Sequence, residues 1–387
     1  MKNQSIALLC APLFLLLAIT SCGNGGETST ESEYAELSSL PVITPKTVLT
    51  ISDSDALLFN FVSHVEPTSE GQILALDART SRAFLFSGDG TLLETGIGEG
   101  RGPGESRFTS SRFSLNDNDE FMIFSQALRR ASIYRIEDGS IHHLADLAME
   151  RFPNGFELLS DGNILIYERK ETTPDGRDYE RFSIISPEGE VVRDEFLTFP
   201  GAERLKIRNE AGALMVSIST PHHPANMFAA DDDIMLVASH KTLGFDMYSI
   251  SSGELLREVR LPVREQPISR DEKRVYVEAY LEAFGMSSSL ASGLLSEMPD
   301  TRGVISDIRY DRSGFVWLQL TYGPDEPENT YRWIVLSEKG ELLGRWDNEA
   351  GARLLYVQDG RMYTASEDEN ELQQIQILDS GLETLTP

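Results

Sequence analysis

Residues 71–90 read GQILALDARTSRAFLFSGDG: a turn glycine, an apolar strand, a polar turn, a second apolar strand and another turn glycine. Short apolar runs that are bounded by Gly, Asp and Ser are typical of strands joined by tight turns. The stretch therefore predicts a β-hairpin, and its recurrence along the chain decides the fold.

The turn and the apolar strand that follows it occur six times. The second turn residue of each copy is 71, 119, 162, 232, 314 or 360, so successive copies lie 48, 43, 70, 82 and 46 residues apart. Three of these intervals have the length of a propeller blade. Each copy continues into another strand and a turn with glycine at 90, 139, 189, 253, 340 or 381. Two hairpins per repeat make a four-stranded antiparallel blade, and we predict an all-β fold, a six-bladed β-propeller.

The strands also suggest their order within a blade. The strand after the first turn is almost wholly apolar, as expected for burial between neighbouring blades. The last strand is more polar in residues 141–144, 191–194 and 255–258, which favours an outer position. Few residues follow Gly381, whereas residues 46–51 form a spare strand. We predict that this strand completes the sixth blade and closes the ring without an open sheet edge.

The two long intervals predict insertions. Ser269 and Glu272 have the spacing of a capping box, and apolar residues at helical spacing follow as far as Gly285. A second helical segment covers about residues 288–298. We predict a small helical insertion at about residues 269–299, between blades four and five. The other long interval contains a candidate strand, residues 213–219, followed by Pro221-His222-His223-Pro224.

The amino terminus has the pattern of a targeting signal. Lys2 precedes an apolar run over residues 6–20, which is too short for a spanning helix and typical of a signal peptide at residues 1–21. The run ends LAITSCG at residues 17–23, which resembles a bacterial lipobox. This resemblance implies cleavage before Cys22 and acylation of Cys22, with palmitate among the lipids, and Gly23 favours the outer membrane of a Gram-negative bacterium. An ordinary secretory signal with an incidental cysteine is the alternative.

Composition sets further limits. Residues 22–40 are rich in Gly, Ser, Thr and Glu and predict a flexible tether before a propeller over residues 41–387. The 387 residues carry a net charge of −28, which disfavours nucleic acid as a partner. Both cysteines, Cys10 and Cys22, precede the propeller. Disulfides and zinc–thiolate sites are therefore not expected there. We expect a monomer that reaches the membrane through its lipid.

The glycine-rich stretch GIGEGRGPGE at residues 96–105 resembles the signature that follows the first blade in TolB-like and NHL-like six-bladed β-propeller lipoproteins of bacteria. The segments around Trp317 and Trp333 are also similar to that family. One departure is that Ser106 and Arg107 stand before Phe108, where the family has an aromatic residue directly after the glutamate. The resemblance implies a surface or periplasmic binding module, with no universal catalytic set.

The sequence carries few signals of catalysis or metal binding. The glycine-rich stretch has neither a Walker lysine nor a following helix, so a tight structural turn is favoured over ligand binding through its amides. There is no HExxH and no GxSxG motif. Residues 231–233, three aspartates, lack the spacing of a calcium loop and predict a solvated turn. His222 and His223 fit an exposed loop better than a metal site. We predict no catalytic residue, no metal ligand and no cofactor.

Cations gather on one predicted face, where the loops between blades meet the turns between the second and third strands. They are Arg79, Arg82, Arg101, Arg107, Arg129, Arg130, Arg169, Lys170, His240 and Lys241. Rim salt bridges with nearby acids are one interpretation. The other is a ligand-binding set of Arg79, Arg101, Arg107 and Arg129, which would prefer an anion such as an acidic glycan.

These observations favour a membrane-tethered module that binds an unidentified protein or an anionic glycan. Whether it faces the periplasm or the cell exterior stays open. The alternative is a metal-dependent propeller enzyme, a lyase or a lactonase-type hydrolase, that acts on a small or glycan-derived anionic substrate.

Overall fold

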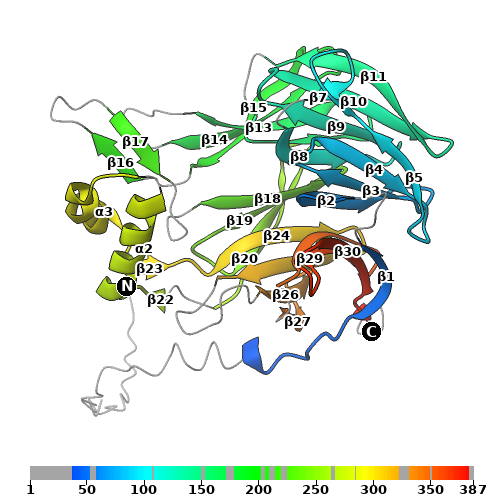
Figure 1. Cartoon of the computed structure of the whole chain (residues 1–387). Coiled ribbons are helices and arrows are strands. Elements are labelled where there is room, and N and C mark those ends of the chain that lie inside the picture. The colour runs from blue at the N-terminus through cyan, green and yellow to red at the C-terminus, as the bar shows by residue number, and fades with distance from the viewer. Residues whose placement is uncertain are drawn as a thin grey trace, which may run out of the picture.

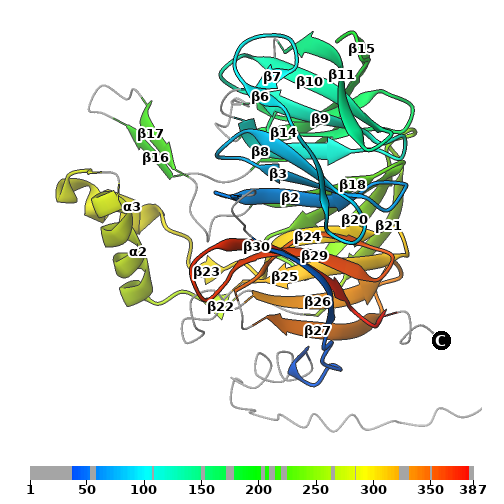
Figure 2. The same ribbon diagram turned by 45° about the vertical axis from the view of Figure 1, so that its right-hand side comes forward.

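The computed structural model describes residues 37–52, 58–106, 109–149, 153–170, 178–201, 205–208, 214–218, 225–262, 266–283, 285–321, 331–348 and 351–382. The described residues form six four-stranded antiparallel sheets around a central axis (Figures 1 and 2). The predicted six-bladed β-propeller is confirmed. Among the residues described, no helix has the length and apolar composition needed to cross a membrane.

The first three blades follow one another along the chain, each from its innermost to its outermost strand. Blade one consists of β2 (Val62–Pro67), β3 (Ile73–Asp77), β4 (Arg82–Phe86) and β5 (Leu92–Gly96). Blade two consists of β8 (Thr109–Leu115), β9 (Glu120–Ser125), β10 (Arg130–Glu137) and β11 (Ser140–Ala148). Blade three consists of β12 (Gly155–Leu158), β13 (Ile164–Lys170), β14 (Tyr179–Ile185) and β15 (Val191–Pro200).

The last three blades complete the ring. Blade four consists of β18 (Asn226–Asp231), β19 (Ile234–Ser239), β20 (Gly244–Ser249) and β21 (Leu255–Arg260). Blade five consists of β24 (Ile305–Asp311), β25 (Phe315–Leu320), β26 (Tyr331–Ser337) and β27 (Leu342–Asn348). Blade six consists of β28 (Arg353–Gln358), β29 (Arg361–Glu367), β30 (Gln373–Asp379) and β1 (Lys46–Ser52).

Blade six joins the two ends of the described chain. The amino-terminal strand β1 pairs antiparallel with β30, with Lys46 opposite Asp379 and Ile51 opposite Ile375. Figure 1 shows the two strands side by side at the right of the molecule, in blue and red. The predicted closure by residues 46–51 is therefore confirmed. The outer positions predicted for residues 141–144, 191–194 and 255–258 are also correct, because they lie in β11, β15 and β21.

Backbone geometry explains why glycine and aspartate recur at fixed places. All twelve turn residues that marked the repeats have a positive φ, from 49° at Asp232 to 88° at Gly314. Glycine adopts this conformation without strain, and aspartate tolerates it better than most residues do. At Gly340 there is a second reason, since a Cβ atom would lie 2.6 Å from the Val259 side chain of the preceding blade.

The core is divided among the gaps between blades. The second strands supply much of it: all five residues of β3 and all six of β25 are buried. Trp317 and Trp333, from the two segments noted in the sequence, are 1% exposed and pack in one cluster between blades five and six. Continuous apolar strands are what burial on both faces requires.

The two predicted insertions are present and stand beside the ring (Figures 1 and 2). Helices α2 (Arg270–Ala283) and α3 (Ala291–Glu297), with the short helix η1 (Ser288–Leu290), connect blades four and five above the paired β22 (Gln266–Pro267) and β23 (Thr301–Arg302). The capping box is real: Ser269 N donates to the Glu272 carboxylate at 3.0 Å, and Glu272 N donates to Ser269 Oγ at 3.2 Å. The candidate strand at residues 213–219 is β17 (Leu214–Ile218), and its partner β16 (Leu205–Arg208) was not predicted.

Candidate functional site

The six innermost strands surround a channel along the propeller axis. Alternate side chains of a strand point to the same side, so each innermost strand sends every second residue towards the channel. Strand β2 supplies His64 and Glu66, β12 supplies Glu157, and β24 supplies Asp307 and Arg309. The channel is therefore lined by charged and polar side chains, whereas the spaces between blades are apolar.

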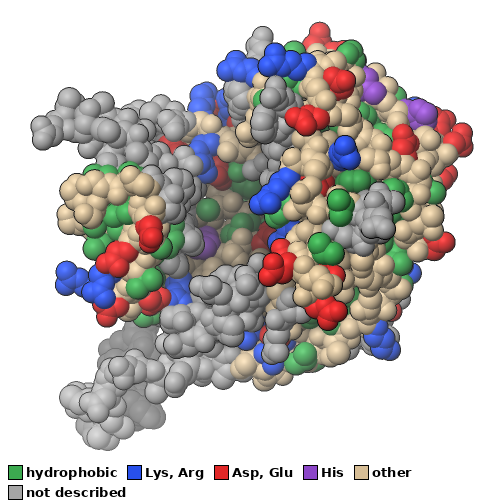
Figure 3. Space-filling view, viewed as in Figure 1, with side chains coloured by type: hydrophobic (Ala, Val, Ile, Leu, Met, Phe, Trp, Pro, Cys, Tyr) green, Lys and Arg blue, Asp and Glu red, His purple; other side chains and the backbone are tan. Residues whose placement is uncertain are grey.

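The channel opens at one end, which we call the wide mouth. It is bounded by the connections between blades and by the turns between second and third strands. Two cavities of about 370 and 410 Å³ lie there, and both are lined by His64, Asp307 and Arg309. Figure 3 shows the molecule hollowed between the helical insertion and the blades, with apolar and charged side chains exposed in the hollow.

The two cavities differ in their walls. The first has an aromatic wall, in which the Phe228 ring centroid lies 5.0 Å from that of Tyr167 and 4.8 Å from that of Phe182. The second contains the Phe61 ring, and the Arg353 guanidinium lies over it at 4.3 Å from the centroid. Apolar surface and cationic groups thus share one opening.

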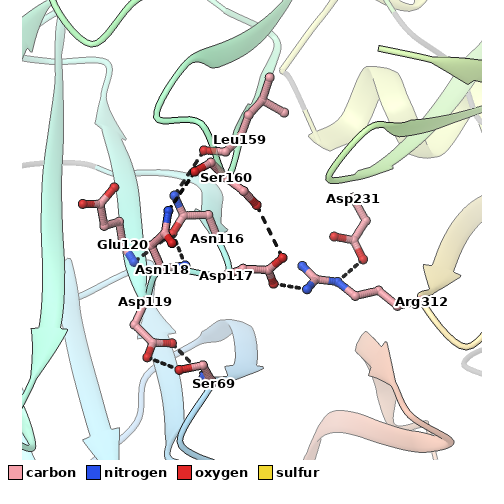
Figure 4. A network of polar contacts seen from close by, with 10 residues as sticks. All are labelled: Ser69, Asn116, Asp117, Asn118, Asp119, Glu120, Leu159, Ser160, Asp231 and Arg312. Carbon is pink, nitrogen blue, oxygen red and sulfur yellow. Dashed lines mark hydrogen bonds and ion pairs between the residues drawn. The ribbon is translucent and has the colours of Figure 1, made fainter. Parts of the chain in front are cut away.

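The opposite end of the channel, the narrow end, is closed by a polar network on the turns between first and second strands (Figure 4). The Arg312 guanidinium, from blade five, pairs with Asp117 of blade two and with Asp231 of blade four. Ser69 Oγ donates to Asp119 at 2.5 Å, and Asn118 Nδ2 donates to the Ser160 carbonyl at 2.8 Å. These bonds link the first three blades.

Asp231 corrects one prediction. Residues 231–233 were expected to form a solvated turn, but the Asp231 side chain is only 13% exposed and pairs with Arg312. The expectation is wrong for this residue because the turn between the first and second strands of a blade points at the axis. Arg312 supplies the counter-charge that water would supply on an outer turn.

Two channel carboxyls are shifted towards their neutral form. Burial raises the pKa of Glu66 to about 8, and the negative charge of Asp231 adds to the rise, while Arg312 and Arg309 oppose it. Burial also raises the pKa of Glu157 well above its usual range, and a hydrogen bond from Ser114 Oγ at 2.9 Å opposes this. Glu66 is therefore largely protonated at pH 7 and can donate a hydrogen bond, and burial shifts Glu157 in the same direction.

The predicted ligand-binding arginines do not form one cluster in what the structure shows. Arg107 and the lipidation candidate Cys22 lie outside the described residues. Arg79 lies at the wide mouth, 6.0 Å from the centroid of Phe61. Arg101 and Arg129 are exposed and lie beside Arg130, near the glycine-rich loop. Their role in binding stays a prediction.

Three of the other predicted cations make ion pairs of the rim type. Arg130 lies 3.4 Å from Asp146, Arg169 lies 3.6 Å from Glu180, and Lys170 lies 3.2 Å from Glu195. His240 is buried rather than exposed on the face, and its ring fills the space where a side chain on Gly303 would lie. Arg130, Arg169 and Lys170 therefore serve as ion-pair partners within the protein, and His240 serves as a packed side chain.

The glycine-rich loop encloses its own anion. The Glu105 carboxylate accepts a hydrogen bond from Gly102 N at 2.6 Å, and a Cβ atom on Gly100 would lie 1.9 Å from it. Arg130 donates to the backbone carbonyls of Arg101, Gly102 and Glu105. The loop thus fits the predicted tight structural turn, because Glu105 occupies the place that a bound anion would take.

The channel carboxyls do not fit a divalent metal ion. Within the described ranges, no three His, Cys, Asp or Glu side chains lie close enough to hold one. The channel acid Asp307 is paired with Arg309 at 2.7 Å instead, and a guanidinium this close opposes a cation. We therefore derive no metal-assisted step for this channel.

The wide-mouth residues were not found from the sequence, although a local signal exists. In residues 62–66, VSHVE, and 305–309, ISDIR, polar and charged side chains interrupt an apolar strand. In an innermost strand, polar or charged residues at alternate positions, such as His64 and Glu66 or Asp307 and Arg309, face the axis.

Comparisons with known proteins support the fold. No protein-family model and no curated protein matches the chain. A Bacteroides fragilis protein whose name marks it as a candidate exported protein is 12% identical, with 87% of this chain and 95% of that chain covered and a TM-score of 0.53.

Two enzymes by name are also similar. Virginiamycin B lyase from Staphylococcus aureus is 11% identical, with 87% and 99% covered and a TM-score of 0.44. A candidate gluconolactonase is 15% identical, with 88% and 94% covered and a TM-score of 0.41. Likenesses this weak say nothing about the activity of this chain. The TolB-like or NHL-like assignment stays a prediction.

Proposed function

We propose that this protein is a lipid-anchored module of the cell envelope that binds a small anionic ligand at the wide mouth of its propeller channel. The observation that carries the proposal is the pair of cavities that meet at Arg309, with Arg353 and Arg79 beside them. Concave sites that combine aromatic side chains with a few charged groups are typical of small-molecule binding, and both cavities combine the two. The lipobox-like residues 17–23 support the anchor and the outer membrane.

The proposed site lies on the face where the sequence predicts a cluster of cations, but it uses other residues. Cations on the face of the inter-blade loops were expected to attract an anion. Arg309 and Arg353 are better placed than Arg101 or Arg129, because they line the cavities themselves. Arg101 and Arg129 lie beside the glycine-rich loop and could still attract an anion from a distance.

A ligand screen tests the proposal. Small carboxylates and sulfonates, with neutral analogues of the same size, are added to the full chain carrying Cys22→Ser, and the melting temperature is measured. A ligand that binds only the folded state raises its stability by RT ln(1 + c/Kd), where c is the ligand concentration, so the melting temperature rises with the logarithm of ligand concentration above the Kd. We expect anions to raise the melting temperature of the parent, and to raise it less at high salt. We expect no such rise in the Arg309→Gln variant. Equal shifts for neutral and anionic analogues would count against the proposal.

The enzyme alternative has its own test. A metal-dependent lyase or lactonase needs a resident divalent ion, so the purified chain is analysed for calcium and zinc by mass spectrometry. Stoichiometric metal that survives dialysis would replace the binding module by the enzyme as the preferred function. We expect metal well below one ion per chain.

A further inference from the structure

We infer that the ligand of the wide mouth is a compact organic anion that carries an aromatic or other flat apolar group, rather than a chain of sugar acids. This inference rests on the proposed function and names the chemical class of its ligand. It departs from the acidic glycan that the rim arginines suggested.

The aromatic wall is the first step. Tyr167, Phe182 and Phe228 contact one another from blades three and four, with Tyr167 and Phe182 stacked at 5.5 Å between centroids. Phe182 is 2% exposed and backs the other two, which are half-buried in the cavity wall. A flat apolar group that binds against this wall would bury apolar surface and could stack on the aromatic rings or meet them edge to face.

The anion-binding end is the second step. Asp307 accepts from Arg309 Nη1 at 2.7 Å, and the Ile308 carbonyl accepts from the same nitrogen at 2.9 Å. These two bonds hold the guanidinium at the junction of the cavities, while Nη2 has no hydrogen-bond partner among the described residues. A guanidinium fixed in this way loses little entropy when it binds a carboxylate or sulfonate.

The acids around the cavities do not cancel this preference. Asp307 offsets part of the Arg309 charge, but Arg353 and Arg79 add two guanidinium groups beside Phe61. Glu157 also lines the first cavity, and burial raises its pKa well above its usual range, which favours its neutral form. In the lining of the second cavity, Arg309 and Arg353 outnumber the one acid, Asp307.

Size and closure argue for a compact ligand. Cavities of about 370 and 410 Å³ that share three lining residues suit a molecule of drug size. Arg312 closes the other end of the channel with its pairs to Asp117 and Asp231. A polymer cannot thread through the ring while these contacts hold.

Three probes test the class. They are 8-anilinonaphthalene-1-sulfonate, its neutral relative N-phenyl-1-naphthylamine, and trigalacturonic acid, a sugar-acid chain. The protein is the full chain carrying Cys22→Ser. Fluorescence titration measures the two naphthyl probes, and calorimetry measures the sugar acid. We expect saturable one-to-one binding of the sulfonate, weaker binding of the neutral probe and no binding of the sugar acid.

Three variants locate the site. Arg309→Gln should weaken the sulfonate about tenfold or more and the neutral probe much less. Phe228→Leu should weaken both naphthyl probes by roughly three- to tenfold. Arg101→Gln removes an exposed arginine of the glycine-rich loop, the rival rim site, and should change neither probe if the site is the wide mouth. Unchanged circular dichroism and melting show that each variant is folded.

The outcomes separate the two proposals. If trigalacturonic acid binds and the sulfonate does not, the inferred ligand class is wrong, but the proposal of an anion-binding module still holds. Sulfonate binding that Arg101→Gln weakens and Arg309→Gln does not would also overturn it, because the site would then be the rim. If neither anion binds, the inference is wrong, and the melting screen with other anions decides the proposed function.

Discussion

Arg312 on a turn of blade five pairs with Asp117 on a turn of blade two, although the two residues lie 195 positions apart in the chain. The same guanidinium pairs with Asp231 of blade four. One side chain thus links three blades across the narrow end, where hydrogen bonds between neighbouring turns link only adjacent blades. The Arg312–Asp117 pair joins blades two and five, which are not neighbours in the ring, whereas the Arg312–Asp231 pair joins neighbours whose strands β18 and β24 already pack together.

Loss of this link should destabilise the ring. We expect Arg312→Met to lower the free energy of unfolding by about 1–3 kcal/mol, because the Asp231 carboxyl, only 13% exposed, would lose its hydrogen-bond and ion-pair partner. Urea unfolding measures the change. A double-mutant cycle with Asp117→Asn isolates the pair, and additive effects of the two variants would show that the contact contributes no coupling.

Two glycines of the glycine-rich loop test whether the enclosed Glu105 carboxylate stabilises the protein. We expect Gly100→Ala to destabilise the protein by about 1–3 kcal/mol, because the new Cβ would lie 1.9 Å from the Glu105 carboxylate and displace it from the loop. Gly98→Ala is the matched control, since its Cβ would be 3.9 Å from Glu105. Thermal unfolding compares the two. Equal melting temperatures would mean that the loop does not depend on the enclosed carboxylate.

The closure by β1 predicts a cooperative effect. Removal of residues 41–51 takes away most of the strand that pairs with β30, together with the Ile43 amide that donates to the Arg345 carbonyl at 2.7 Å. We expect the melting temperature to fall by several degrees or more, because blade six loses its outer strand and the ring its closing contacts. Differential scanning calorimetry measures it. A deletion variant that melts as the parent does would show that the ring closes without β1.

The sequence predicted the blades because their signals are local. A turn such as Asp161-Gly162 needs a positive φ, and a second strand such as β25 needs apolar side chains on both faces; each requirement is visible within ten residues. Closure by residues 46–51 followed from counting strands. The capping box of Ser269 and Glu272 was found for the same reason, since its two bonds span three residues.

The channel site depends on relations that the linear sequence does not contain. His64 and Arg309 lie 245 positions apart and meet only when the ring closes. Arg130 looked like a surface cation, but it is used to hold three backbone carbonyls of the glycine-rich loop. Charge and spacing alone do not reveal which arginine has a structural partner.

The anchor is tested by one substitution. We expect Cys22→Ser to yield a protein that leaves the membrane fraction, because its thiol is the predicted site of acylation and the chain has no other cysteine after the signal peptide. Immunoblotting of membrane and soluble fractions after a salt wash measures the distribution. If the variant stays in the membrane fraction to the same extent, another contact holds the protein there.

The last prediction concerns Glu66 and pH. Its pKa is raised from 4.5 to about 8 in the folded protein, so between these values the folded chain holds a proton that the unfolded chain has released. The unfolded state binds fewer protons there, and stability therefore falls as pH rises from about 4.5 to 8. A residue that is neutral at every pH avoids this loss. Glu66→Gln keeps an oxygen that can accept the Leu115 amide hydrogen bond.

We therefore expect Glu66→Gln to match the parent at pH 4.5 and to exceed its free energy of unfolding at pH 8, by on the order of 2 kcal/mol after allowance for rearrangement around the ionised group. Urea unfolding at pH 4.5, 6, 7 and 8 gives the difference as a curve. Glu120→Gln is the control, because Glu120 pairs with Arg135 at the surface and its loss should not stabilise the protein at high pH. A difference between Glu66→Gln and the parent that stays flat over this range would show that Glu66 is ionised in the channel, held by Arg309 and Arg312.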